Sequence, residues 1–257
     1  MLLFVYGSLL RGMSLSHHME GAEFLGPAFV KAELYFLGFY PGIIKGDQVI
    51  YGELYDVPVH LLSKIDEVEE YYENDDEKSV YLRKEIEITR FSDGRKINAE
   101  AYFYNRPVAG KQKIEGGDYR IYMNNIYQKP TWFACYENFL NQQSLPSLIK
   151  FAPETKEGKL EGFTKIYNLK SGINGYAYAN LLFDKKGLNC EATAWKLNPE
   201  QMDLLDKKLD VPNLYHRVSI PFLSKGNELI IAHTFLGNVD LLGENLHPLP
   251  AGRRSAT

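Results

Sequence analysis

The sequence predicts an α+β protein in which one order of strands and helix occurs twice along the chain. Residues 52–66 align with residues 192–206 without a gap, at a constant offset of 140 residues. A Tyr-x-Arg pattern follows each stretch, at residues 81–83 and 215–217. The chain of 257 residues has room for two small domains. Because matching elements recur in the same order, we infer a diverged tandem duplication rather than two unrelated domains.

The first copy, predicted to span residues 1–125, starts with an apolar strand. Leu2–Tyr6 is a short apolar run that stops at Gly7-Ser8, as a buried strand that enters a loop would. Pro58 suits the first turn of a helix. The elements predicted after the first strand are a strand at 29–39, a strand at 49–57, a helix at 58–70, an alternating strand at 80–88 and, beyond a hairpin turn at Asp93-Gly94, a strand at 99–104.

The second copy, predicted to span residues 130–247, repeats this order. Residues 116–122 lead into a linker that ends near Pro130. The elements predicted after it are a strand from Phe133, a strand at 191–197, a helix at 198–210, an alternating strand at 214–220 and, beyond a turn at Gly226-Asn227, a strand at 229–235. Residues 248–257 are predicted to form a flexible tail.

The composition favours a soluble globular protein that binds no nucleic acid. Hydrophobic residues make up 45% of the chain and charged residues 24%. The net charge is −4 and the pI about 5.9, which argues against a nucleic-acid surface. No apolar run approaches the ~18 residues of a membrane span. The apolar start, Met1–Val5, lacks the basic lead and the cleavage site of a signal peptide. We therefore expect a cytoplasmic protein without a membrane partner.

Neither the cysteines nor the histidines indicate a metal or a cofactor. Cys135 and Cys190 each lie in an apolar stretch, which is typical of buried thiols in a reducing compartment. None of the six histidines pairs with a cysteine or carboxylate at the spacing of metal ligands. We therefore predict no metal site and no cofactor.

Glu69 is the candidate catalytic residue. It lies four residues after Ile65 and seven after Leu62, so it shares the helix face of these apolar residues. The second copy carries Leu209 at the equivalent position, which indicates that the site faces the interior. A carboxylate buried without a partner has a raised pKa, which suits proton transfer near neutrality. The alternative is that Glu69 ends the helix and turns to solvent beside Glu70.

The loop Tyr6-Gly7-Ser8-Leu9 is the second candidate. Glycine and serine after a strand can direct several backbone N–H groups at an anion, although many strand ends carry these residues without binding anything. In the second copy we align this loop with residues 135–138, so that Tyr136 stands at the position of Gly7. The acid in this stretch, Glu137, should repel a carboxylate. Nothing near Ser8 in sequence suggests a His or Asp partner, so we predict no serine nucleophile.

Seven short motifs of the first copy resemble a known family in their combination and order. They are Phe-Val-Tyr-Gly-Ser-Leu-Leu-Arg-Gly at 4–12, Tyr-Pro-Gly-Ile at 40–43, Tyr-Gly-Glu-Leu-Tyr-Asp-Val at 51–57, Ile-Asp-Glu-Val-Glu at 65–69, Tyr-Leu-Arg at 81–83, Ala-Tyr-Phe-Tyr at 101–104 and Gly-Asp-Tyr-Arg at 117–120. The family is the γ-glutamylcyclotransferase superfamily, most closely its AIG2-like and γ-glutamylamine cyclotransferase branch. The resemblance covers residues 2–122, and the second copy is similar more distantly, through residues 133–138 and 205–217.

The resemblance implies a fold and a set of site residues. The family fold is a small β-barrel of mixed strands with short helices around it, so we expect two such barrels in tandem. The family's catalytic glutamate falls on Glu69. Its substrate-binding residues fall on Tyr6, Gly7, Ser8, Leu9 and Tyr81. In the second copy the glutamate position is Leu209, so we expect the second copy to be inactive.

The implied activity is that of a lyase or acyltransferase which releases 5-oxoproline. The α-amine of a γ-glutamyl amine or γ-glutamyl amino acid attacks its own δ-carbonyl, and Glu69 acts first as base and then as acid. Backbone N–H groups of the loop fix the α-carboxylate or polarise the carbonyl. Two alternatives stay open: a binding protein of the same fold without catalysis, and an amidohydrolase that uses Glu69 and water.

Two features leave further alternatives open. Residues 70–78 form a long acidic stretch where close relatives often have a short turn. It is either a solvated loop or a lid that favours a cationic leaving group, such as a polyamine or a lysine side chain. The second copy is expected to pack on the first as a structural partner, which would make the chain a pseudo-dimer.

Overall fold

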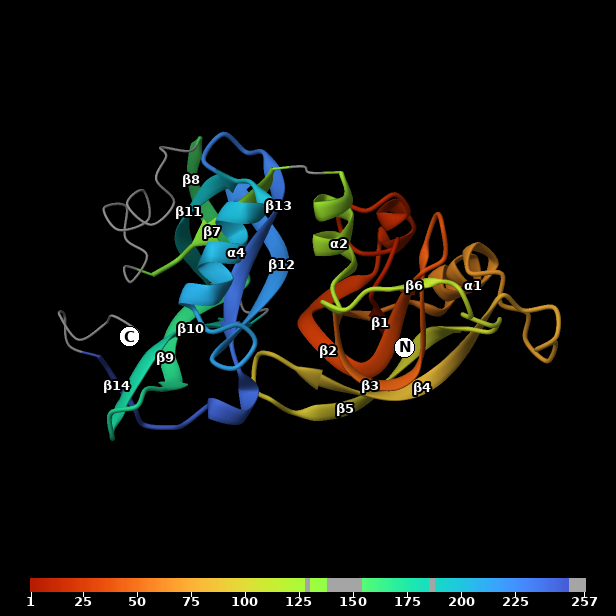
Figure 1. The fold of residues 1–257 in the computed structure, drawn as a ribbon, viewed down its shortest axis with the longest axis horizontal. Helices are drawn as coiled ribbons and strands as arrows, with labels where there is room; N and C mark the ends of the chain where they lie inside the picture. Colours follow the sequence, from red (N-terminus) through yellow and green to blue (C-terminus); the bar gives the residue numbers. More distant parts are fainter. Residues whose placement is uncertain (128–129, 138–153, 185–187, 250–257) are drawn as a thin grey trace. The chain divides into compact units, whose positions relative to one another are not determined.

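The computed structural model describes residues 1–127, 130–137, 154–184 and 188–249. The chain divides into two compact units, each of which contains a ring of five strands (Figure 1). The first unit comprises residues 1–90 and 95–123, and the second comprises residues 91–94 and the chain from 124 onward. No helix in the described ranges is both long enough and apolar enough to cross a membrane. The predicted tail, 248–257, lies outside the described residues from position 250 on.

Five strands of the first unit close into a barrel. They are β1 (Leu2–Val5), β2 (Glu23–Phe36), β3 (Pro41–Asp56), β4 (Tyr81–Arg90) and β5 (Lys96–Tyr104). The neighbours β1–β3, β3–β2, β2–β4 and β4–β5 are antiparallel, and the parallel pairing of β5 with β1 closes the ring. A short strand, β6 (Gln112–Lys113), pairs with β2.

The side chains of β1 alternate between two apolar clusters, as the two-residue period of a strand requires. Phe4 and Tyr6 belong to a cluster drawn from β1 to β5, which is the barrel interior. Leu3 and Val5 belong to a second cluster on the outer face. This outer cluster packs under the helix α1 (Val59–Val68) and the short 3₁₀ helix η1 (Ser16–Met19).

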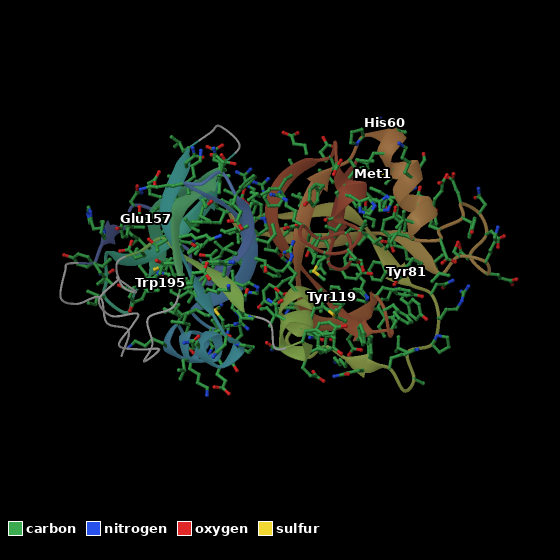
Figure 2. The ribbon with its side chains drawn as sticks, turned by 90° about the horizontal axis from the view of Figure 1, so that it is seen from above. Met1, His60, Tyr81, Tyr119, Glu157 and Trp195 are labelled. Atoms are coloured by element: carbon green, nitrogen blue, oxygen red, sulfur yellow. The ribbon has the colours of Figure 1, made fainter. Side chains whose placement is uncertain are left out.

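Helix α1 lies on the barrel through one apolar face. Leu61, Leu62 and Ile65 are buried there, and each such side chain stabilises the fold by about 1.5–3 kcal/mol. His60, on the opposite face, is exposed and lies at the outer side of the helix (Figure 2). The helix ends at Val68, which leaves Glu69 as its C-terminal cap.

The second unit repeats the five-stranded barrel. Its strands are β7 (Thr131–Cys135), β8 (Thr155–Glu161), β11 (Asn189–Leu197), β12 (Tyr215–Ser224) and β13 (Leu229–Gly237). The pairings β7–β11, β11–β8, β8–β12 and β12–β13 are antiparallel, and β13 closes the ring against β7 in parallel. Helix α4 (Pro199–Lys208) connects β11 to β12, as α1 connects β3 to β4. The prediction of two small barrels with short flanking helices is confirmed.

The second unit also has elements outside its barrel. They are β9 (Phe163–Lys170), β10 (Tyr176–Phe183), β14 (His247–Pro248) and the 3₁₀ helix η3 (Val239–Leu241). The sequence analysis did not predict the β9–β10 hairpin. It was also wrong about the segment after residue 116, because part of the expected linker is the helix α2 (Tyr119–Ile126).

The strand registers correct the alignment of the two loops. Val5 pairs with Glu53, and Cys135 pairs with Thr193, which is the residue 140 positions after Glu53. Val5 therefore corresponds to Cys135, and the sequence alignment was one residue out of register. The alignment of the loop rested on four residues alone. The two copies differ in length between this loop and the helix, so the ungapped alignment of the helices could not fix the position of the loop.

Equivalent hydrogen bonds support the corrected register. The hydroxyl of Tyr6 donates to the backbone oxygen of Tyr102 at 2.6 Å, and that of Tyr136 donates to the backbone oxygen of Phe235 at 2.8 Å. Tyr136 thus matches Tyr6, and the residue at the position of Gly7 is Glu137.

Candidate active site

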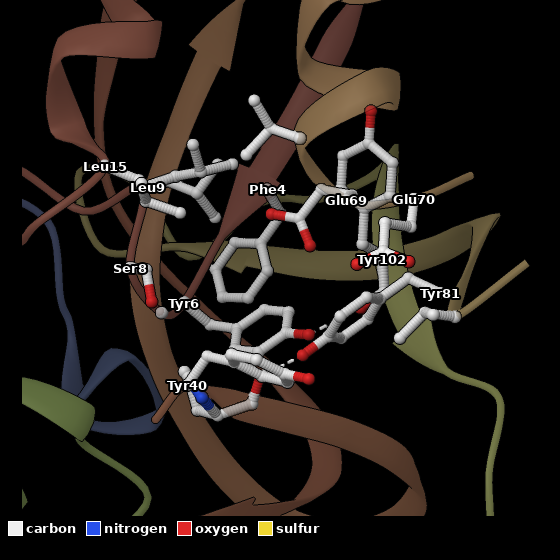
Figure 3. A pocket seen from close by; sticks show the side chains of 15 residues that line it. Phe4, Tyr6, Ser8, Leu9, Leu15, Tyr40, Glu69, Glu70, Tyr81 and Tyr102 are labelled. Carbon is white, nitrogen blue, oxygen red and sulfur yellow. Dashed lines mark hydrogen bonds between the residues drawn. The ribbon is translucent and has the colours of Figure 1, made fainter. Parts of the chain in front are cut away.

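A pocket of the first unit brings together all of the site residues that the sequence predicted. Its volume is about 590 Å³ with the open mouth included. Figure 3 shows side chains of β1, α1, β4 and β5 that converge on it. The lining comprises residues 4–9, Leu15, residues 40–41, residues 68–70, residues 80–81 and Tyr102.

Glu69 extends its carboxylate into this pocket, above the ring of Phe4 (Figure 3). Within the described part of the chain the carboxylate has no hydrogen-bond or ion-pair partner. Burial disfavours its charged form and raises the pKa of Glu69 from 4.5 to about 7. A carboxyl group with this pKa can both accept and donate a proton at neutral pH.

The end of α1 fixes the direction of Glu69. The N–H of Tyr71 donates to the oxygen of Asp66, and the N–H of Glu70 donates to the oxygen of Glu67, at 2.9 and 3.2 Å. This is a Schellman motif, and Glu70 takes its left-handed position with φ of 49°. The chain reverses there, so the preceding side chain, that of Glu69, is left at the helix end over the pocket.

Asp66 ties the same helix end to the barrel. Its Oδ1 accepts a hydrogen bond of 2.7 Å from the hydroxyl of Tyr102, and its Oδ2 lies 3.3 Å from Nη1 of Arg83. These contacts join α1 to β4 and β5, and they hold the backbone on which Glu69 is carried.

The loop after β1 needs glycine at position 7. A Cβ on Gly7 would lie 2.5 Å from Cγ of Pro41, closer than real contacts allow. The loop folds on itself, because the N–H of Leu10 donates to the oxygen of Gly7 and that of Leu15 to the oxygen of Ser8, both at 3.0 Å. The N–H groups of Ser8 and Leu9 donate to no group in the described part of the chain. Both residues also line the pocket.

Three tyrosines of the pocket, Tyr6, Tyr81 and Tyr102, use their hydroxyls within the protein. Tyr6 donates to the backbone oxygen of Tyr102 and accepts the N–H of Ile43 at 3.3 Å. Tyr81 donates to the backbone oxygen of Pro41 at 2.7 Å. Burial, with the charge of Glu69 nearby, raises the pKa of Tyr6 well above its ordinary value. Tyr6 and Tyr81 are therefore neutral, and they shape the pocket with their rings.

The second unit keeps this geometry without the chemical groups. Leu209 caps α4 as Glu69 caps α1, is 3% exposed and belongs to an apolar cluster. The next residue, Asp210, has φ of 50°, as Glu70 has 49°. At the position of Gly7, Glu137 is buried, with its carboxylate 3.4 Å from Nζ of Lys165. The cap position of α4 therefore carries no carboxylate, and a buried acid stands where the first unit has the loop glycine.

Sequence reasoning missed nine of the lining residues, which are Phe4, Val5, Leu15, Tyr40, Pro41, Val68, Glu70, Val80 and Tyr102. Tyr40 and Tyr102 lie in two of the motifs quoted for the family resemblance, which was the available signal. Of the acidic stretch 70–78, Glu70 lines the pocket. Ser79 anchors that stretch, since its hydroxyl donates to the oxygens of Tyr72 and Asp75. Within the described ranges no three His, Cys, Asp or Glu side chains gather to hold a metal.

Comparison with known proteins gives the family. Residues 3–121 match the model of the family "Gamma-glutamyl cyclotransferase, AIG2-like". The family protein YtfP of Escherichia coli K12 is 34% identical over 120 residues, which cover 46% of this chain and 96% of YtfP. The γ-L-glutamyl-butirosin B γ-glutamyl cyclotransferase of Niallia circulans is 35% identical over 106 residues, which cover 40% of this chain and 67% of that enzyme.

A solved structure supports the fold over both units. The crystal structure of YkqA from Bacillus subtilis matches 92% of this chain and 83% of its own, with a TM-score of 0.74 and 20% sequence identity. At this identity the match bears on the fold alone. The sequence match to YtfP, which extends over nearly the whole of that protein, bears on the family. The chain belongs to the AIG2-like γ-glutamylcyclotransferase family of enzymes.

Proposed function

We propose that the first unit releases 5-oxoproline from a γ-glutamyl amine or γ-glutamyl amino acid, with Glu69 as the proton-transfer group. One observation carries the proposal: a carboxylate without a partner, with its pKa raised to about 7, extends into the pocket bounded by the Gly7–Leu9 loop. The named activity of the relative, a γ-L-glutamyl-butirosin B γ-glutamyl cyclotransferase, supports the reaction class.

The reaction needs one proton relay. Glu69 takes a proton from the substrate ammonium, and the freed α-amine attacks the δ-carbonyl carbon of the same glutamyl group. A C–N bond forms in the ring, and Glu69 then returns the proton to the departing nitrogen as the exocyclic C–N bond breaks. The ring nitrogen loses its second proton as the neutral lactam forms, and the released amine takes up that proton and leaves as an ammonium. One group can perform both steps because its pKa lies near neutrality.

The loop supplies the anchor for the glutamyl group. The lining, drawn from the described residues, contains no lysine or arginine. The unbonded N–H groups of Ser8 and Leu9 are therefore the donors for the α-carboxylate or the developing oxyanion. A substrate held at both ends is kept in the conformation that cyclises, which is an orientation effect.

The second unit takes no part in the chemistry under this proposal. Leu209 replaces the glutamate, and Glu137 replaces the loop glycine. Its role is structural, and a single active site serves the whole chain.

The test is a product assay with a matched control. The purified chain is incubated with a panel of γ-glutamyl amino acids and γ-glutamyl amines, and 5-oxoproline is measured by mass spectrometry. Glu69→Gln should lower kcat by about 10²–10⁴-fold, the usual range for a general acid–base group. Glu67→Gln, which removes an exposed acid of the same helix, should leave the rate unchanged.

Other products would contradict the proposal. Free glutamate in place of 5-oxoproline would identify an amidohydrolase. Binding of the substrates without turnover would identify a binding protein. Full activity in Glu69→Gln would remove Glu69 from the mechanism.

A further inference from the structure

A buried ion pair lies outside the pocket lining, beside residues 6–12, which we call the substrate loop. Glu53 of β3 is 1% exposed, and Arg120 of α2 is 7% exposed. Nη2 of Arg120 lies 2.7 Å from Oε1 of Glu53. Burial alone would raise the pKa of Glu53, but the charges of Arg120 and Arg11 hold it below the ordinary value. The carboxylate is therefore charged at neutral pH.

Both members of the pair also bind the backbone of Arg11, two residues beyond Leu9. The N–H of Arg11 donates to Oε2 of Glu53 at 3.2 Å, and Nε of Arg120 donates to the backbone oxygen of Arg11 at 3.0 Å. The ion pair thus holds one residue of the loop from both sides. This arrangement provides partners for four polar groups, namely the carboxylate of Glu53, the guanidinium of Arg120, and the backbone N–H and oxygen of Arg11.

Two side chains extend the arrangement. The hydroxyl of Tyr55 donates to Oε2 of Glu53 at 2.8 Å and accepts from Nε of Arg11 at 3.2 Å. The guanidinium carbon of Arg11 lies 3.6 Å from the ring centre of Phe24, a cation–π contact. The loop residue is therefore bound through its backbone and its side chain to β2 and β3.

A tight turn fixes the approach of Arg120. Gly117 has φ of 66°, and a Cβ there would lie 1.9 Å from the backbone oxygen of Val49. The N–H of Tyr51 donates to the oxygen of Gly117 at 2.9 Å, so the turn is bonded to β3. Asp118 then accepts the N–H of Ile121 at 2.9 Å and starts α2. The Gly-Asp-Tyr-Arg motif at 117–120 is accounted for by this placement.

We propose that the Glu53–Arg120 pair is a positioning device for the substrate loop, which sets where the N–H groups of Ser8 and Leu9 lie relative to Glu69. The inference rests on the proposed function for its catalytic consequence. The second unit has Thr193 in place of Glu53 and Trp195 in place of Tyr55, and its loop has also lost the glycine. In the second copy the loop glycine and two of the groups that hold the loop are thus replaced together.

Two variants separate positioning from simple stability. Arg120→Lys keeps a positive charge for Glu53 but loses the second donor, to the oxygen of Arg11. The double variant Glu53→Gln/Arg120→Gln removes both charges, so no unpaired buried ion is left to unfold the protein. Lys113→Gln is the control, because the half-exposed pair of Lys113 with Glu33, 3.0 Å long, does not contact the loop.

The first readout, amide hydrogen exchange of peptides covering residues 7–12, needs no substrate. Exchange should rise at least tenfold in Arg120→Lys and in the double variant, while peptides of β2 and β3 keep wild-type rates. The control should match wild type throughout. Unchanged exchange of residues 7–12 in either variant while it stays folded would overturn the proposal.

The second readout is catalysis on the panel substrate that wild type turns over fastest. The variants should lose 10- to 100-fold in kcat/KM, while the acidic limb of the pH profile stays near pH 7, because Glu69 is untouched. Faster exchange with unchanged kcat/KM would overturn the positioning role. If wild type releases no 5-oxoproline from any substrate, the proposed function fails, and exchange alone then decides whether the pair holds the loop.

Discussion

Glu69 shows how one side chain gains its chemistry from position alone. Its carboxylate has no ion pair and no hydrogen bond in the described part of the chain, and burial is the cause of its raised pKa. The ordinary carboxyl group of a glutamate would be too weak a base near neutrality. The end of α1 places it at the edge of an apolar cluster, and no further residue is needed to adjust it.

The pH dependence of the reaction should report this pKa. Because the unprotonated carboxylate must accept the first proton, kcat/KM should fall about tenfold for each pH unit below about 7. A pH–rate profile of 5-oxoproline release measures it. An acidic limb near pH 4.5, the ordinary value, would show that Glu69 is not the titrating group.

The same pKa predicts a stability effect. The folded-state pKa lies above the unfolded value, so the folded chain holds the extra proton, and stability is lost as pH rises from 4.5 through about 7. A carboxyl group shifted this far costs about 3 kcal/mol above pH 7. Glu69→Gln should therefore stabilise the first unit by up to ~3 kcal/mol at pH 8 and hardly at all at pH 4.

Denaturant unfolding at the two pH values is the measurement. Glu67→Gln, which changes an exposed acid, should show no such pH dependence. An equal effect of Glu69→Gln at pH 4 and pH 8 would contradict the burial of its charge.

At this scale the sequence predicted the position of Glu69 but not its surroundings. The comparison with Leu209 worked because the two helices align without a gap, so the face of one reports the face of the other. Tyr40 lies just before β3, and Tyr102 lies near the end of β5. No periodicity within a strand shows which strand ends will meet, so only the family motifs could have indicated these two residues.

Among the elements, the loop after β1 depends most on a single residue. Gly7 is needed because of the close approach of Pro41, and the turns that follow bring Ser8 and Leu9 to the pocket. The one-residue error in aligning this loop arose because the register of a strand is set by its partner, which the sequence of the strand itself does not contain. Helix α1, whose period is visible in its own sequence, was predicted to within two residues.

Gly7→Ala tests the requirement for space. The added Cβ would meet Cγ of Pro41 at 2.5 Å, so the loop must move. We expect a loss of about 1–3 kcal/mol in stability and at least tenfold in kcat/KM. Gly116→Ala is the matched control, because a Cβ there has no neighbour within 4 Å. Thermal unfolding and product release measure the two effects, and wild-type values for Gly7→Ala would show that the loop tolerates a side chain.

At the scale of the whole chain, the two barrels have the same closed ring of pairings. The glutamate at the helix cap and the glycine of the loop stand in the first barrel and are replaced in the second. The duplication was predictable because helix and strand patterns recur at a fixed spacing. The closure of each ring was predictable only through the family resemblance, since a parallel contact such as β5 with β1 joins segments about a hundred residues apart and leaves no local pattern.

Leu209→Glu tests whether the second barrel can be reactivated. In a full chain that also carries Glu69→Gln, we expect no 5-oxoproline, because Glu137 replaces the loop glycine. The buried carboxylate should destabilise the protein by about 3 kcal/mol, more at pH 8 than at pH 5. Leu204→Glu, at an exposed position of the same helix, should be near neutral. Recovery of turnover would show that the second loop still binds the substrate.

The cap that ends α1 and α4 has a consequence for how such a chain evolves. Both helices end in the same conformation, whether the cap is glutamate or leucine. In each case the acidic residue after the cap, Glu70 or Asp210, has a backbone in the left-handed region. The backbone therefore accepts either side chain at the cap. One substitution exchanges the candidate catalytic carboxylate for an apolar side chain that packs in the core. Once a second copy existed, selection for robustness could favour leucine there at no cost to turnover. Under the proposed function, one polypeptide thus carries both sides of the trade-off between stability and activity, each on its own copy of the scaffold.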